Sequence, residues 1–142
     1  MSILERIDSP LDLKDLTVDE LKSLSEEIRQ QIIATVTKNG GHLASALGVI
    51  ELTVALHYIF NAPVDKIIFD VGHQSYAHKI LTGRKNTFDT LRRFNGVNGF
   101  TRASESPYDT FISGHSSTSL SVAAGLMRAK NLMGASYEII SV

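Results

Sequence analysis

Cysteine is absent from the 142 residues of this chain. Its absence excludes disulfide bonds, zinc ribbons and thiol nucleophiles. The Gly-x-Ser-x-Gly pattern of a serine nucleophile is missing as well, which argues against an α/β-hydrolase site. The five histidines are therefore the residues best suited to acid–base chemistry in this chain.

Neither sign of charge is in excess, since 14 basic residues face 15 acidic ones. The basic residues are scattered rather than striped, which does not indicate a nucleic-acid or membrane surface. The longest apolar run, Leu47 to Phe60, is short and contains Glu51 and His57, so it predicts no membrane span. The first residues lack the basic start and apolar core of a signal peptide. We expect a soluble cytoplasmic protein with one hydrophobic core.

The N-terminal segments are patterned for packing. Thr17 and Glu20 form a capping box, and apolar residues at helical spacing follow from Leu21 to Val36. Asn39-Gly40-Gly41 is typical of a helix end. Further along, Val49 to Phe60 is apolar on almost every side, which predicts a central buried helix.

Two later segments share one plan of apolar strand, Gly-His and helix. In the first, Ile67-Ile68-Phe69 predicts a strand buried on both faces, and Gly72-His73 follows it. In the second, Phe111-Ile112 predicts a short buried strand, and Gly114-His115 leads into a helix that ends near Met133. These are called the first and second Gly-His corners below.

The second Gly-His corner has the composition of an anion site. Ser113, Ser116 and Ser117 are residue types that cap helix N-termini. Free backbone N–H groups and the positive end of the helix dipole are expected to converge there. The corner therefore predicts a site for an anion such as a phosphate.

Helices and strands alternate along the chain, which predicts an α/β fold with a doubly wound parallel sheet and helices on both faces. Ligands of such sheets bind beyond the carboxyl ends of the strands, so both corners are expected at one sheet edge. Residues 1–142 are expected to form part of a single domain. The last predicted strand, Tyr137 to Val142, has no outgoing crossover, so we expect a sheet truncated at its C-terminal end.

The remaining histidines have different settings. His42 lies in a loop of small residues, where glycine lets the backbone pass close to another group. His57 is expected to be a hydrogen-bonded core residue. His78 follows His73 by five residues, the wrong spacing for two metal ligands on one helical face. The polar loop from Thr101 to Asp109 has the length and composition of a functional lid.

Long motifs along the whole chain resemble the 1-deoxy-D-xylulose-5-phosphate synthase family, a transketolase-like group of thiamine-diphosphate enzymes. The matching segments are Gly41–Tyr58, Asp70–Arg84, Ser104–Ser106 with Tyr108-Asp109, and Gly114–Ser119. The resemblance implies a thiamine-diphosphate-binding fold and covers only the N-terminal part of a family whose members are several times longer. It implies a transferase that condenses pyruvate with D-glyceraldehyde 3-phosphate and releases carbon dioxide, as the first step of the non-mevalonate isoprenoid pathway.

By resemblance, His73 and the segment Gly114-His115-Ser116 contact thiamine diphosphate. His42 matches a family histidine that transfers a proton at the reacting carbonyl, a task suited to imidazole. Arg102 is a candidate to bind a phosphate or carboxylate, although the amino-acid sequence of its loop departs from the family pattern. Two further residues, Asp70 and Tyr76, are expected to hold the first corner in shape.

The resemblance also implies Mg²⁺, bound through a Gly-Asp-Gly…Asn motif that would follow Val142. No residue of this chain is predicted as a metal ligand. We therefore expect the isolated chain to be inactive and the complete enzyme to be a homodimer. The alternatives are a non-catalytic truncated remnant or partner-binding module, and a hydrolase that depends on His115 or Ser116.

Overall fold

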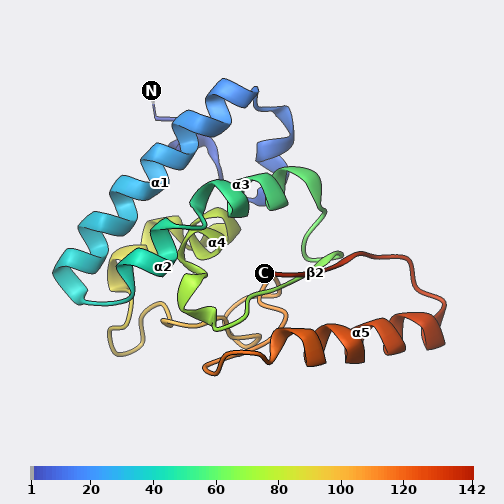
Figure 1. Ribbon diagram of the computed structural model, residues 1–142. Coiled ribbons are helices and arrows are strands. Elements are labelled where there is room, and N and C mark those ends of the chain that lie inside the picture. The colour runs from blue at the N-terminus through green and yellow to red at the C-terminus, as the bar shows by residue number, and fades with distance from the viewer. Residues whose placement is uncertain (1) are drawn as a thin grey trace.

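The computed structural model describes residues 2–142 as an α/β arrangement of helices around a small parallel sheet (Figure 1). The α-helices are α1 (Val18–Asn39), α2 (Leu43–Leu47), α3 (Ile50–Ile59), α4 (Tyr76–Lys79) and α5 (Ser119–Met133). The 3₁₀-helices are η1 (Leu4–Arg6), η2 (Pro10–Asp15), η3 (Gly72–Gln74) and η5 (Lys85–Thr90), while η4 (Ile80–Arg84) is a π-helix. The strands are β1 (Lys66–Ile68) and β2 (Ile139–Ser141).

Helix α1 follows its sequence pattern closely. The Thr17 hydroxyl accepts a hydrogen bond from the backbone N–H of Glu20, and the Glu20 carboxylate accepts one from the backbone of Thr17 in return. This reciprocal cap satisfies N–H groups that a helix start leaves unpaired. The helix ends at Asn39, where Gly40 takes a φ of 78°, a conformation that glycine adopts at little cost. The predicted capping box and helix end are both confirmed.

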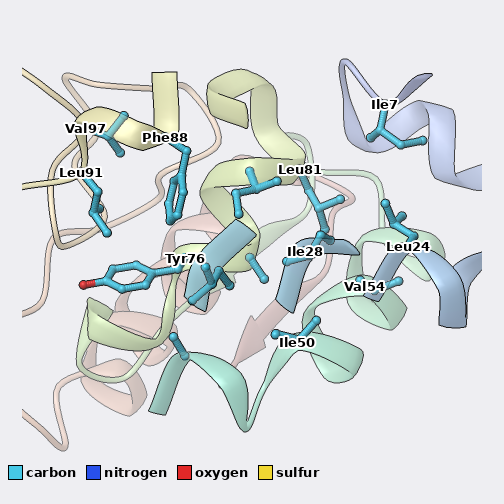
Figure 2. Packing of buried hydrophobic residues seen from close by; sticks show 14 of the residues in the cluster. Ile7, Leu24, Ile28, Ile50, Val54, Tyr76, Leu81, Phe88, Leu91 and Val97 are labelled. Carbon is cyan, nitrogen blue, oxygen red and sulfur yellow. The ribbon is translucent and has the colours of Figure 1, made fainter. Parts of the chain in front are cut away.

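The main core lies between α1, α3 and the α4–η5 segment (Figure 2). Leu24, Ile28 and Ile32 of α1 are fully buried. On the opposite side, the rings of Tyr76 and Phe88 meet edge to face with centroids 5.8 Å apart. Burial of each such side chain stabilises the fold by about 1.5–3 kcal/mol. This cluster is the principal source of stability among the described residues.

Helix α3 is buried on one face only. Ile50 and Val54 are buried in the main core, whereas Leu52 is 47% exposed and Ile59 is 64% exposed. The prediction of a helix buried on almost every side is therefore wrong. The outer apolar residues of α3, Leu52 and Ile59 among them, are left partly exposed by the rest of residues 2–142.

The sheet consists of β1 and β2, which pair in parallel with Lys66 opposite Ile139 and Ile68 opposite Ser141. Two of the predicted strands are thus confirmed, as is an α/β fold with a parallel sheet. The predicted strand at Phe111-Ile112 is wrong, since neither residue belongs to a strand and they are 38% and 50% exposed. An apolar pair forms a strand only where a ladder partner lies beside it, and none does here. The doubly wound arrangement stays a prediction.

Helix α5 packs less completely than α1. Figure 1 shows it as the lowest element of the view, next to β2 and apart from α1. Ser119 is its only buried residue, and Leu120 and Met133 are 73% and 78% exposed. Within residues 2–142, no helix combines the length and apolar character needed to cross a membrane.

Candidate functional site

The two Gly-His corners lie in direct contact. The backbone N–H of Gly72 donates to the carbonyl of Ser113 over 2.9 Å. A Cβ on Gly72 would lie 3.0 Å from the backbone nitrogen of Thr101 and 3.3 Å from that carbonyl, so the close approach favours glycine. The predicted meeting of the corners is confirmed. Only the first corner follows a strand, because the strand predicted before the second does not form.

Asp70 joins the first corner to the start of α5. Its carboxylate oxygens accept hydrogen bonds from the backbone N–H groups of Ser117, at 2.9 Å, and of Thr118, at 3.3 Å. A carboxylate at a helix N-terminus is stabilised by the helix dipole. The expectation of free N–H donors is therefore wrong at these two residues, because Asp70 already occupies them.

Donors do remain in the second corner. The N–H groups of residues 114–116 donate to no protein acceptor within residues 2–142, and Gly114, His115 and Ser116 are exposed. A Cβ on Gly114 would meet no atom within 4 Å. Behind this segment, the Ser113 hydroxyl donates to the carbonyl of His115 over 2.8 Å and accepts from the Thr118 hydroxyl over 2.7 Å. The turn is thus braced on one side and open on the other.

His42 and His73 lie together, with ring centroids 5.0 Å apart and planes at 82°. His73 Nδ1 is 2.9 Å from the carbonyl oxygen of Val71. Because a carbonyl can only accept, Nδ1 carries a proton and Nε2 is the bare nitrogen of the neutral ring. The backbone N–H of His42 donates to the Tyr76 hydroxyl over 3.3 Å, and a Cβ on Gly41 would lie 2.8 Å from that hydroxyl. The predicted shaping role of Tyr76 thus has a structural basis at His42.

Val71 adopts a positive φ of 55°. For a β-branched residue this conformation is an outlier, and such residues cost about 1–3 kcal/mol each. The strained peptide aims the Val71 carbonyl at the His73 ring, which sets the tautomer described above. Strain of this kind concentrates at functional sites, and the sequence pattern gave no sign of it.

A cavity of about 630 Å³ opens beside His42. Its lining residues are His42, Tyr76, Arg92, Arg93, Phe94, Asn95, Gly96, Val97, Asn98, Gly99, Phe100, Arg102 and Ile112. Three guanidinium groups and no carboxylate belong to this lining, so the cavity favours an anionic occupant. The predicted site residues His73 and Gly114–Ser116 are not part of the lining.

Three buried side chains, His57, His78 and Asp109, are connected by hydrogen bonds. His78 Nε2 is 3.1 Å from an oxygen of Asp109, and His78 Nδ1 is 2.9 Å from His57 Nε2. Because the carboxylate accepts, His78 carries its proton on Nε2, and His57 must then donate from its own Nε2. Burial lowers the pKa of both histidines, that of His57 most strongly. The prediction of His57 as a hydrogen-bonded core residue is confirmed.

Two loop carboxylates and two helix cations complete this buried charge cluster. Asp109 accepts from both terminal nitrogens of Arg84, at 2.9 and 2.8 Å, and Glu105 accepts from Lys79 over 2.5 Å. Burial would raise the pKa of Asp109, but hydrogen bonds from His78 and Arg84 outweigh it and hold that pKa well below its usual range. The pKa of Lys79 is lowered, first by burial and then by Arg84. Paired charges of this kind are tolerated in a protein interior because each has a partner.

Sequence reasoning missed the buried charge cluster, although a signal was present. Every residue from Tyr76 to Leu81 is buried, and this run contains His78 and Lys79. Residues of these types are rarely buried without partners. The polar loop that follows supplies the partners in Glu105 and Asp109. Both residues lie in segments that match the family, but no structural role was predicted for either.

No group of three or more histidine, cysteine, aspartate or glutamate side chains within residues 2–142 is arranged to hold a metal ion. The Mg²⁺ ligands implied by resemblance stay a prediction. The second corner fits an anionic cofactor only in part. The open N–H groups of residues 114–116 and the Ser116 hydroxyl are hydrogen-bond donors for an anion. The next two N–H groups are already bonded to Asp70 and are closed to an anion.

A parallel sheet, an arginine-bearing cavity beside His42 and one corner with open N–H donors define an α/β protein whose surface chemistry favours anions. A family model described as 1-deoxy-D-xylulose-5-phosphate synthase matches residues 4–142. The chain belongs to the 1-deoxy-D-xylulose-5-phosphate synthase family.

Relatives bearing that name are similar over nearly the whole chain. The chain is 60% identical over 140 residues to a 1-deoxy-D-xylulose-5-phosphate synthase of Caldanaerobacter subterraneus subsp. tengcongensis, which covers 99% of this chain and 22% of the relative. It is 59% identical to one of Carboxydothermus hydrogenoformans, with the same coverage, and 54% identical to one of Thermus thermophilus, with 23% of the relative covered. The chain thus spans about a fifth of the length of these relatives.

Proposed function

We propose that this chain forms the N-terminal part of a 1-deoxy-D-xylulose-5-phosphate synthase. The complete enzyme would be a transferase that condenses pyruvate with D-glyceraldehyde 3-phosphate, releases carbon dioxide and begins isoprenoid precursor synthesis. Family membership over residues 4–142 supports the assignment. The observation that connects the assignment with particular side chains is the contact between the rings of His42 and His73, whose centroids lie 5.0 Å apart. We further propose a homodimer in the cytoplasm.

Thiamine diphosphate would supply the electron sink for this reaction. His73 would contact it, because the bond to Val71 fixes the ring and leaves Nε2 free. Gly114, His115 and Ser116 would bind its diphosphate through open N–H groups and the serine hydroxyl. Mg²⁺ ligands are proposed to lie outside residues 1–142.

His42 would hold and move a proton at the reacting carbonyl of a substrate. Its backbone is fixed by the Tyr76 hydroxyl, and its ring lines the cavity. Positioned imidazoles contribute roughly 10²–10⁴-fold to reactions of this type. The cavity around His42 would favour anionic substrates through its arginines.

The proposal is tested with a chimera in which this chain replaces the matching segment of the Caldanaerobacter relative. The chimera should form 1-deoxy-D-xylulose 5-phosphate when supplied with pyruvate, D-glyceraldehyde 3-phosphate, thiamine diphosphate and Mg²⁺. His42→Asn should lower kcat by about 10²–10⁴-fold with unchanged cofactor affinity, whereas His73→Ala should weaken cofactor binding. Lys22→Ala, on the exposed face of α1, is the matched control.

The 142-residue chain alone is expected to consume no pyruvate under the same conditions. Turnover by the chain alone would contradict the proposed need for the remaining length. A folded chimera that binds cofactor but makes no product, or full activity in His42→Asn, would contradict the assignment itself.

A further inference from the structure

One wall of the cavity is a segment without helix or strand. Asn98, Gly99, Phe100 and Arg102 line the cavity from this segment, and no ladder or helix hydrogen bonds hold their backbone. Ordering an irregular backbone costs about 1–2 kcal/mol per residue in conformational entropy. A defined cavity wall at this place therefore requires anchors from elsewhere.

The anchors are the two loop carboxylates of the buried charge cluster. Asp109, which is 2% exposed, accepts a hydrogen bond from the backbone N–H of Arg102 over 2.7 Å. Glu105 accepts one from the backbone N–H of Asn98 over 2.8 Å. Each carboxylate thus binds a cationic side chain of a helix and also accepts a hydrogen bond from the main chain of a residue that lines the cavity. Charge-assisted bonds of this type are about twice as strong as neutral ones.

The side chain of Arg102 is available for a ligand. It makes no hydrogen bond or ion pair with any of residues 2–142, and it is exposed at the cavity. Arg93, by contrast, donates to the side-chain oxygen of Asn39 over 2.8 Å. A free guanidinium presents a planar fork that matches a carboxylate or a phosphate.

We propose that Asp109 is a positioning residue that holds Arg102 at the cavity, where Arg102 pairs with an oxyanion group of the substrate. The group is a carboxylate or a phosphate monoester. The identity of the substrate rests on the proposed function, whereas the oxyanion preference rests on the cavity itself. Asp109 acts through the main chain and does not touch the ligand.

The test uses the 142-residue chain, titrated in separate arms with pyruvate and with inorganic phosphate at constant ionic strength, while NMR follows the cavity resonances. Wild-type chain should show saturable shifts at Arg102. Arg102→Ala should weaken binding at least about tenfold, since a charged hydrogen bond is lost. Hydrogen exchange of residues 98–106 should stay unchanged in this variant, because only its backbone N–H serves the cluster.

Asp109→Asn should weaken binding by a similar factor and should also accelerate exchange of residues 98–106. The double variant Arg102→Ala/Asp109→Asn should bind no more weakly than Arg102→Ala alone, because both changes remove one interaction. Glu105→Gln, at a partly exposed carboxylate, serves if Asp109→Asn fails to fold. Ile28→Val lowers global stability away from the loop and should leave the affinity unchanged.

Saturable binding in both arms that is lost in Arg102→Ala supports a general oxyanion site at Arg102. Binding to pyruvate alone assigns Arg102 to a carboxylate, and binding to phosphate alone assigns it to a phosphate monoester. No saturable binding in either arm overturns the inference, as do additive effects in the double variant or an equal loss in Ile28→Val. Anion binding without turnover in the chimera counts against the proposed function alone, and turnover without anion binding counts against this inference alone.

Discussion

Helices α1 and α5 differ in how much of each is covered by the rest of the described chain. Helix α1 places Leu24, Ile28 and Ile32 in the main core with no exposed surface. Helix α5 buries only Ser119 and leaves Leu120 largely exposed. An apolar stripe shows that a helix has a face to bury, and it does not show what covers that face.

The contrast separates a well-packed body from a loosely covered helix. The body around α1 carries the hydrophobic core and the buried charge cluster, whereas α5 begins at the open second corner. Binding segments are commonly drawn from the less stable parts of a protein. We therefore expect α5 and its corner to exchange amide protons sooner than α1.

The largest expected effect tests this comparison by making the same substitution, leucine to alanine, in each of the two helices. Leu24→Ala in α1 should lower the free energy of unfolding by about 2–5 kcal/mol, because it leaves a cavity in the core. Leu120→Ala in α5 removes the same atoms from an exposed site and should cost less than about 0.5 kcal/mol. Chemical denaturation of both variants measures the difference. Equal losses would show that α5 is covered in solution.

A second prediction concerns pH and the α1 body. Since burial lowers the pKa of His57 and His78, the folded state keeps both neutral while the unfolded state takes up protons below about pH 6.5. Stability should therefore fall as pH drops from 7 to 5, by up to about 1.4 kcal/mol per pH unit for each histidine. His57→Gln should reduce this slope by about half.

Below this range the depressed pKa values of Glu105 and Asp109 take over. Their stabilisation is present above their unfolded pKa values near 4 and is lost as pH falls further. Denaturation midpoints measured from pH 8 to pH 3 cover both windows. A flat profile between pH 7 and pH 5 would contradict the buried neutral histidines.

The most local of the expected effects lies at the start of α5. Asp70→Ala removes the carboxylate that accepts from Ser117 and Thr118, and should lower the local stability of the first turn by about 1 kcal/mol. Hydrogen exchange of residues 117–124 should quicken while that of α1 stays constant. Asp19→Ala, at an exposed position of α1, is the control. Unchanged exchange at α5 would show that the cap contributes nothing.

Local signals in the sequence predicted the elements that depend on neighbours in the chain. The capping box at Thr17, the stop at Gly40 and the strand before Asp70 all appear, within a residue or two, where the pattern places them. These features are set by backbone geometry and nearby side chains. His42 and His73 were expected in one site by resemblance, but the direct contact of their rings was not predicted.

The errors concern partners that are distant in the chain. Phe111-Ile112 lacks a neighbouring strand, which no local pattern reveals. Asp70 occupies donors 47 residues away, and the free N–H groups inferred from the helix start are partly used for that reason. The buried charge cluster likewise pairs α4 with a loop that the sequence presents as solvent-facing.

The pairing of β1 with β2 has a consequence for the order of folding. Lys66 and Ile139 are adjacent in the sheet although 73 residues separate them along the chain (139 − 66). Closing so long a loop is entropically costly and slow compared with forming local helical contacts. The helical body can assemble while the chain is still being synthesised, but the sheet must wait for its second strand. Within residues 2–142, we therefore expect the sheet to close after the helical body has assembled.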